Sequence, residues 1–184
     1  MKSGKEFSVR LEWFEVSVAL HIAGLRHAMS VRDKRKDNHG YQGRDLQDNL
    51  YGVLGEMAVA KLKNFYFPAT VDTFKNADLG KNIQVRTVGS NRNRNLIVRP
   101  DDSCSDVFVL VEIIKKEGYY DGLVHGWIWG KDAKRDDWLS NFGQPHRPSA
   151  YRVPTSELNE PNIAELKLGL SIRNRLIYFV GQNF

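Results

Sequence analysis

The stretch Gly55–Thr87, GEMAVAKLKNFYFPATVDTFKNADLGKNIQVRT, decides the fold that we predict for this chain. It begins inside an amphipathic helical pattern, passes through a turn at 77–80 with the sequence ADLG, and ends on an alternating run at 83–87. Side chains alternate between the two faces of a strand. Gln84 and Arg86 therefore share one face, and the apolar residues of the run share the other.

Four polar side chains are brought together by this pattern. Glu56 lies in the predicted helix, Asp78 in the turn, and Gln84 and Arg86 on the strand. Gly80 lets the chain turn sharply between the aspartate and the strand. We expect two acids, an amide and a guanidinium to converge in one cleft at one sheet edge, which is the chemistry of a metal site beside a phosphate.

These motifs resemble the PD-(D/E)XK nuclease superfamily, to which many type II restriction enzymes and Holliday-junction resolvases belong. The resemblance implies that Glu56 is the helical acid of that family and Asp78 its aspartate. It likewise implies that Gln84 and Arg86 occupy the positions of its Glu/Gln-x-Lys pair. Ala77 stands where the family has proline, and Arg86 stands where it has lysine. Short sequence motifs elsewhere in the chain also look like those of phage-borne proteins of this type.

The resemblance further implies Mg²⁺ (or Mn²⁺) as cofactor and DNA as substrate. Asp78 would be the main ligand, joined by the backbone carbonyl of Val85 and the amide oxygen of Gln84, with Glu56 binding directly or through water. Arg86 would hold a phosphate oxygen, because an arginine stays protonated and cannot act as a general base. Gln84 is neutral where a glutamate would be charged, so the metal should bind more weakly.

The order of the patterns predicts an α/β (α+β) fold with a mixed central β-sheet flanked by helices. We interpret residues 1–184 as one domain, with a restriction-endonuclease-like core at about 45–158, an N-terminal helix and a C-terminal extension. The strands at 83–88 and 96–98 are predicted to form a hairpin. Helices are predicted at 11–29, from Asp45 onward and at 160–170, and further strands at 65–74, 107–114, 123–129, 151–153 and 176–180.

The charge distribution favours a polyanionic partner. The chain of 184 residues has a net charge of +5, and five basic residues without an acid lie between Lys81 and Arg99. We predict phosphate contacts at two places, a turn and a polar loop whose Tyr41 could stack on a base. For the loop, we slightly favour the alternative that it is only a solvated, mobile segment. The predicted phosphate-binding residues are Arg35, Lys36, Arg44, Lys81, Arg92 and Arg94.

Composition also limits the cellular setting. A hydrophobic content of 41% is enough for a packed core, and no apolar run has the length of about 18 residues that a membrane span needs. The first residues show no signal-peptide pattern, and the single Cys104 allows no internal disulfide. We therefore expect a cytoplasmic protein, in the host cell if it is phage-encoded, without a membrane partner and with a homodimer left open.

Three hypotheses for function remain open at this point. The first is a metal-dependent DNA endonuclease or exonuclease. The second is a nuclease-fold protein that binds nucleic acid, or regulates, without cleaving; Gln84 and Arg86 favour it. The third is an interaction protein whose fold only echoes that family.

Overall fold

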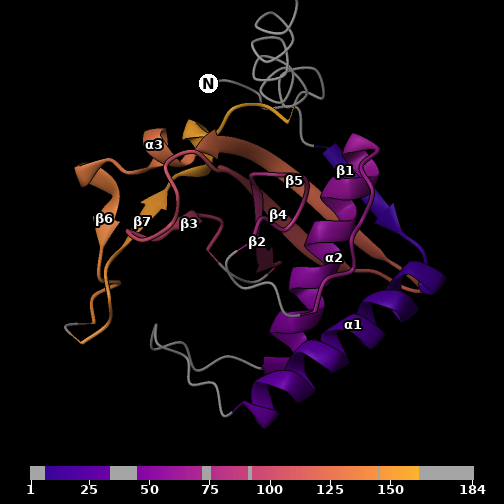
Figure 1. The fold of residues 1–184 in the computed structure, drawn as a ribbon. Helices are drawn as coiled ribbons and strands as arrows, with labels where there is room; N and C mark the ends of the chain where they lie inside the picture. Colours follow the sequence, from indigo (N-terminus) through magenta and orange to yellow (C-terminus); the bar gives the residue numbers. More distant parts are fainter. Residues whose placement is uncertain (1–6, 34–44, 72–75, 91–92, 145, 162–184) are drawn as a thin grey trace, which may run out of the picture.

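The computed structural model describes residues 7–33, 45–71, 76–90, 93–144 and 146–161, and it has a mixed α/β architecture with two β-sheets (Figure 1). A four-stranded sheet carries the candidate site. Its strand order is β1-β5-β4-β2, with β2 parallel to β4 and the other pairs antiparallel. The strands are β1 (Phe7–Leu11), β2 (Ile83–Gly89), β4 (Val107–Lys115) and β5 (Tyr120–Trp129).

One long helix, α2 (Asp45–Lys63), lies across one face of this sheet, and a second, α1 (Trp13–Arg32), packs against α2 (Figure 1). α2 lies close against β2, and a Cβ atom added at Gly55 would overlap the Cγ2 methyl of Thr87. The small residue that opens the stretch 55–87 thus permits the close approach of helix and strand.

A second, three-stranded antiparallel sheet packs on the opposite face of the main sheet. Its order is β3-β7-β6, built from β3 (Leu96–Val98), β7 (Ala150–Val153) and β6 (Leu139–Ser140). A short helix, α3 (Gly130–Ala133), follows β5, and single 3-10 turns lie at Asp136–Trp138 and Thr155–Glu157. The predicted strand at 151–153 is confirmed.

The main sheet is therefore covered on both sides, and β4 shows the consequence most clearly. Its first seven residues are buried, in agreement with the continuous apolar run VFVLVEI. Val109, Val111 and Ile113 belong to the core beneath the helices, whereas Phe108 and Leu110 belong to a second core beneath the small sheet. A strand buried on both faces reads as an unbroken hydrophobic run.

The hairpin predicted from 83–88 and 96–98 is wrong. β2 pairs in parallel with β4, and β3 leaves the main sheet to pair with β7. The physical reason is burial, because β3 contributes Leu96 and Val98 to the core between the two sheets. The helices also cover only one face of the main sheet, so "flanked by helices" holds for that face alone.

Two further predictions differ from the structure, and two lie almost entirely outside its described residues. Leu11 ends β1, a strand that the sequence analysis missed, and α1 starts two residues later. The predicted strand at 65–74 forms no strand over its described part, 65–71. The predicted helix at 160–170 and strand at 176–180 lie almost entirely outside the described residues. No helix within the described ranges is both long and apolar enough to cross a membrane.

Candidate metal and phosphate site

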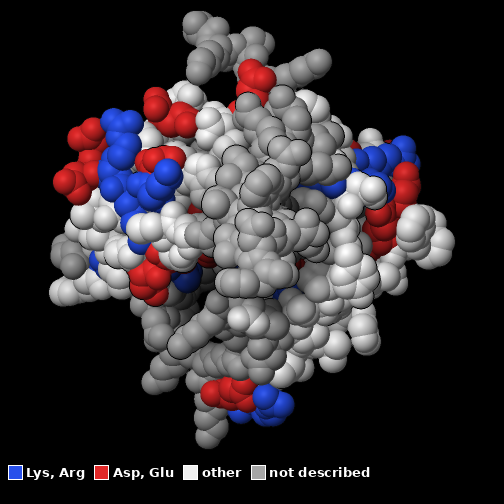
Figure 2. All heavy atoms as spheres, turned by 45° about the horizontal axis from the view of Figure 1, so that its top comes forward, with Lys and Arg blue, Asp and Glu red and all other residues white. Residues whose placement is uncertain are grey.

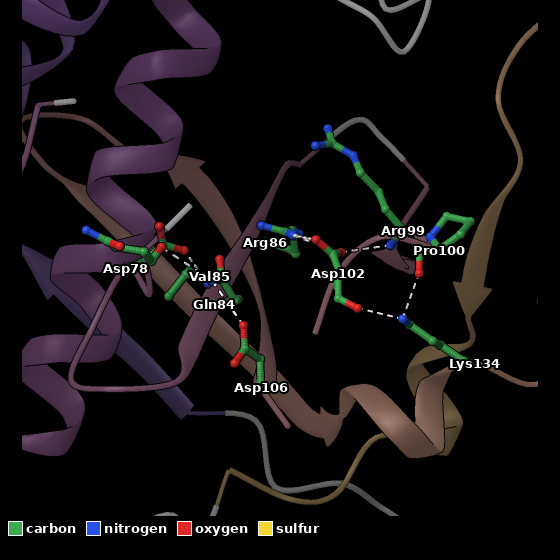
Figure 3. Close-up of polar contacts among 10 residues, drawn as sticks. Asp78, Gln84, Val85, Arg86, Arg99, Pro100, Asp102, Asp106 and Lys134 are labelled. Atoms are coloured by element: carbon green, nitrogen blue, oxygen red, sulfur yellow. Dashed lines mark hydrogen bonds and ion pairs between the residues drawn. The ribbon is translucent and has the colours of Figure 1, made fainter. Parts of the chain in front are cut away.

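Asp78 is fixed at the open edge of β2. The Asp78 Oδ2 atom accepts a hydrogen bond of 2.7 Å from the backbone N–H of Val85 (Figure 3). Just before the strand, Leu79 and Ile83 exchange backbone hydrogen bonds of 3.1 and 3.2 Å around a turn in which Gly80 has a φ of 60°. The N–H and C=O groups of one strand residue point to the same edge. The Val85 carbonyl therefore opens on the edge that carries the Asp78 carboxylate.

Glu56 is held by an arginine that the sequence analysis did not name. Its two carboxylate oxygens accept hydrogen bonds of 2.7 and 2.8 Å from Arg26 of α1. Arg26 also donates to the carbonyl of Thr70 from Nε and Nη2. Only 5% of Glu56 is exposed, and burial raises the pKa of its carboxyl although Arg26 opposes the rise. Both oxygens are thus engaged in a buried ion pair.

Arg86 is likewise paired, on the other face of the sheet. Its guanidinium lies over the ring of Phe108, at 5.2 Å, and its Nη2 atom is 3.0 and 3.1 Å from the two carboxylate oxygens of Asp102 (Figure 3). Phe108 belongs to the core beneath the small sheet. The predicted separation of faces along β2 is therefore present, with Arg86 opposite the helices.

Gln84 points toward a second acid in the same segment as Asp102. Its amide nitrogen donates to Asp106 Oδ2 at 3.3 Å and to the Asn76 carbonyl at 3.4 Å. Two acids of the segment after Pro100, Asp102 and Asp106, thus meet the two polar side chains of β2.

The charges of Arg26 and Arg86 both act on the Asp78 carboxylate. Burial raises the pKa of the Asp78 carboxyl, and the Val85 N–H, followed by Arg86 and Arg26, opposes the rise. Asp78 in turn contributes to raising the pKa of Glu56. Arg26–Glu56 and Arg86–Asp102 are thus two ion pairs on either side of one carboxylate. Among the described residues, no lysine or arginine forms an ion pair with Asp78 itself.

A cavity of about 760 Å³ opens beside Asp78. Asp78 and Asp106 are the two acids in its wall, and Lys81 is its one lysine. Glu56, Gln84 and Arg86 do not line it, so the predicted convergence of these three residues with Asp78 on one cleft is not present in this cavity. The lining residues are Phe65, Tyr66, Pro68, Thr70, Asn76, Ala77, Asp78, Gly80, Lys81, Ser103 and Asp106.

A divalent cation fits at Asp78 better than at Glu56. Mg²⁺ keeps several waters and commonly binds through one or two carboxylates plus a substrate phosphate. Asp78 Oδ1 and the Val85 carbonyl suit that requirement, whereas both oxygens of Glu56 are bound by Arg26. Over the described part of the chain, no group of three or more acid, histidine or cysteine side chains is arranged to hold a metal by itself. The site thus suits a cation that shares its coordination with water and phosphate.

The predicted phosphate-binding residues have different surroundings. Lys81 is exposed at the cavity wall. Arg94 instead binds Glu112, a fully buried residue of β4, with its Nη2 and Nε atoms 3.2 and 3.0 Å from the carboxylate oxygens. Glu112 Oε2 is also 3.0 Å from Nε2 of His125. Arg35, Lys36, Arg44 and Arg92, together with Tyr41, lie outside the described residues.

The surface charges do not form one broad basic face in the view that Figure 2 presents. At the edges of that view, basic and acidic side chains of the described residues lie side by side (Figure 2). In that view, the described residues therefore present mixed charge instead of a continuous basic surface.

Comparison with known proteins adds nothing to this geometry. No protein-family model matches the chain, and neither the curated proteins nor the solved structures provide a significant match.

Proposed function

We propose that this protein is a metal-dependent nuclease that hydrolyses phosphodiester bonds of DNA, with a restriction-endonuclease-like core. The observation that carries the proposal is the placement of Asp78. Its carboxylate is fixed by the Val85 N–H at the open edge of β2, forms one wall of a cavity, and has no cationic partner among the described residues. A partly buried carboxylate without such a partner is a favourable place for a hard cation.

The residues around Asp78 have separate roles in this proposal. Asp78 and the Val85 carbonyl would hold Mg²⁺ or Mn²⁺, which when bound supplies charge stabilisation and activates water at the phosphate. Lys81, exposed on the cavity wall, would contact a phosphate of the substrate. Arg86, paired with Asp102 on the other face of the sheet, takes no proton, since a guanidinium stays protonated. Glu56, bound by Arg26, would act on the cation through water.

A cleavage assay tests the proposal directly. Linear, nicked and branched DNA are incubated with the full chain and Mg²⁺ or Mn²⁺. We expect cleavage by the wild type and at least a hundredfold loss in Asp78→Asn, in line with the magnitude that removal of one strong electrostatic contact produces. Asp101→Asn is the matched control, because Asp101 is an exposed acid of the turn beside the site. Equal cleavage by Asp78→Asn and wild type would overturn the assignment.

The second candidate function is binding of nucleic acid without cleavage. The observation in its favour is that Glu56 and Arg86 are both engaged by partners within the protein. The two candidates give different results in one experiment. Binding of the same DNA substrates without products in either metal would support the binding module, and absence of binding at low salt would contradict both.

A further inference from the structure

Arg86 and Asp102 form a contact to which the proposed function gives no role. Both carboxylate oxygens of Asp102 accept hydrogen bonds from Arg86 Nη2. The Oδ2 atom also accepts a hydrogen bond of 2.8 Å from the backbone N–H of Arg99. Lys134 donates hydrogen bonds to two backbone carbonyls of the same turn, that of Pro100 at 2.8 Å and that of Asp102 at 2.5 Å (Figure 3). Asp102 is therefore held in place from three sides.

An arginine in the position of Arg86 poses a difficulty for a metal at Asp78. Arg86 is the next residue on β2 after Val85, whose backbone N–H binds the Asp78 carboxylate. A planar guanidinium binds a carboxylate through two parallel hydrogen bonds, more tightly than a lysine ammonium would. If Arg86 bound Asp78 in this way, the carboxylate would be neutralised and its oxygens would be occupied.

The turn at Asp102 removes this competition. Arg86 is directed to the side of the sheet away from the helices, where Asp102 and the ring of Phe108 hold it. The other nearby arginine, Arg26, is bound to Glu56 in a comparable way. Arg26 and Arg86 are thus each paired with another acid, Glu56 and Asp102. Among the described residues, neither arginine forms an ion pair with Asp78.

We infer that Asp102 is a positioning residue that keeps the Arg86 guanidinium away from Asp78 and so leaves the Asp78 carboxylate open to a divalent cation. The inference rests on the proposed function, since it requires that Asp78 binds a metal. It assigns Asp102 no contact with the metal or the substrate, and it explains how arginine can replace lysine next to this carboxylate.

The test is a calorimetric titration of the full chain with Mn²⁺ alone, without DNA. Asp102→Asn keeps an oxygen for the Arg99 N–H but loses the charge that holds Arg86. We expect this variant to bind Mn²⁺ roughly 10–100-fold more weakly, the usual effect of losing a residue that supports a metal ligand. In an Arg86→Met background, where no guanidinium competes, Asp102→Asn should leave Mn²⁺ affinity unchanged.

The dependence on residue 86 separates positioning from a general structural role. Damage to the turn would weaken Mn²⁺ binding in both backgrounds, and Asp101→Asn controls for removing a charge from the same turn. Persistence of the loss in the Arg86→Met background, or no loss in Asp102→Asn, would overturn the inference while leaving the metal site intact. Absence of Mn²⁺ binding in the wild type would instead overturn the proposed function, and this inference with it.

Discussion

At the scale of single residues, two arginine–carboxylate pairs determine the surroundings of Asp78. Glu56 and Arg26 come from neighbouring helices and are mostly buried. A buried ion pair is weak evidence for net stability, because desolvation of both charges opposes their attraction. Its loss on one side is nevertheless costly, since the remaining charge has no counterion. Removing one partner of the pair should therefore lower the free energy of unfolding measurably.

Arg26→Met should destabilise the protein by about 3–5 kcal/mol, the cost of leaving a buried charge unpaired. The double variant Arg26→Met, Glu56→Met should recover most of that loss, because it buries no charge. Urea unfolding followed by circular dichroism measures both variants. A single variant as stable as the wild type would show that Glu56 is not buried against Arg26 in solution.

At the scale of elements, the site depends on how closely α2 approaches β2. The contact lies at Gly55, where an added Cβ would overlap the methyl group of Thr87, and it sets the distance between the helix bearing Glu56 and the strand that follows Asp78. Gly52, one turn earlier on the same helix, has open space around it. The two glycines are thus a matched pair, with the same helix and different surroundings.

We predict opposite effects of alanine at these two glycines. Gly52→Ala should stabilise the protein by about 0.5–1 kcal/mol, because alanine is the better helix former. Gly55→Ala should destabilise it by about 1–3 kcal/mol, the range for overpacking a close contact. Thr87→Ser removes the overlapping methyl, so the double variant with Gly55→Ala should regain stability. Denaturant unfolding midpoints of the three variants measure these changes. Stabilisation by Gly55→Ala alone would contradict the close packing of α2 against β2.

At the scale of the whole molecule, nucleic-acid binding should depend on a few cations beside the cavity. Lys81 is exposed there, whereas Arg94 is engaged by the buried Glu112. Binding through phosphates weakens with salt in proportion to the number of contacts. These two basic residues, which the sequence alone treated alike, should therefore behave differently.

Lys81→Ala should reduce the slope of log affinity against log salt by about 0.9 for duplex DNA, the value for one phosphate contact. Arg94→Ala should leave that slope unchanged and lower stability by about 1–3 kcal/mol, because Glu112 loses one of its two partners. Fluorescence anisotropy over a salt series, with thermal unfolding in parallel, measures both. A reduced slope in Arg94→Ala would show that Arg94 reaches the nucleic acid.

The sequence by itself determined the local features of this protein. Alternation along 83–87 predicted that Gln84 and Arg86 share one face, and the residues at 107–114 predicted a strand; both are confirmed. These features follow from backbone periodicity, which acts over a few neighbouring residues.

Only the tertiary structure decided which residues meet. Arg26 and Glu56 are 30 positions apart in the chain, and Arg86 and Asp102 are 16 apart. No local pattern specifies such pairs, because each depends on how helices and strands pack. The same holds for β3, whose three residues suit either sheet and join the one that lets Leu96 and Val98 be buried. A charged side chain near a candidate site finds its partner only when the fold removes both from water, and that desolvation is a property of the assembled structure.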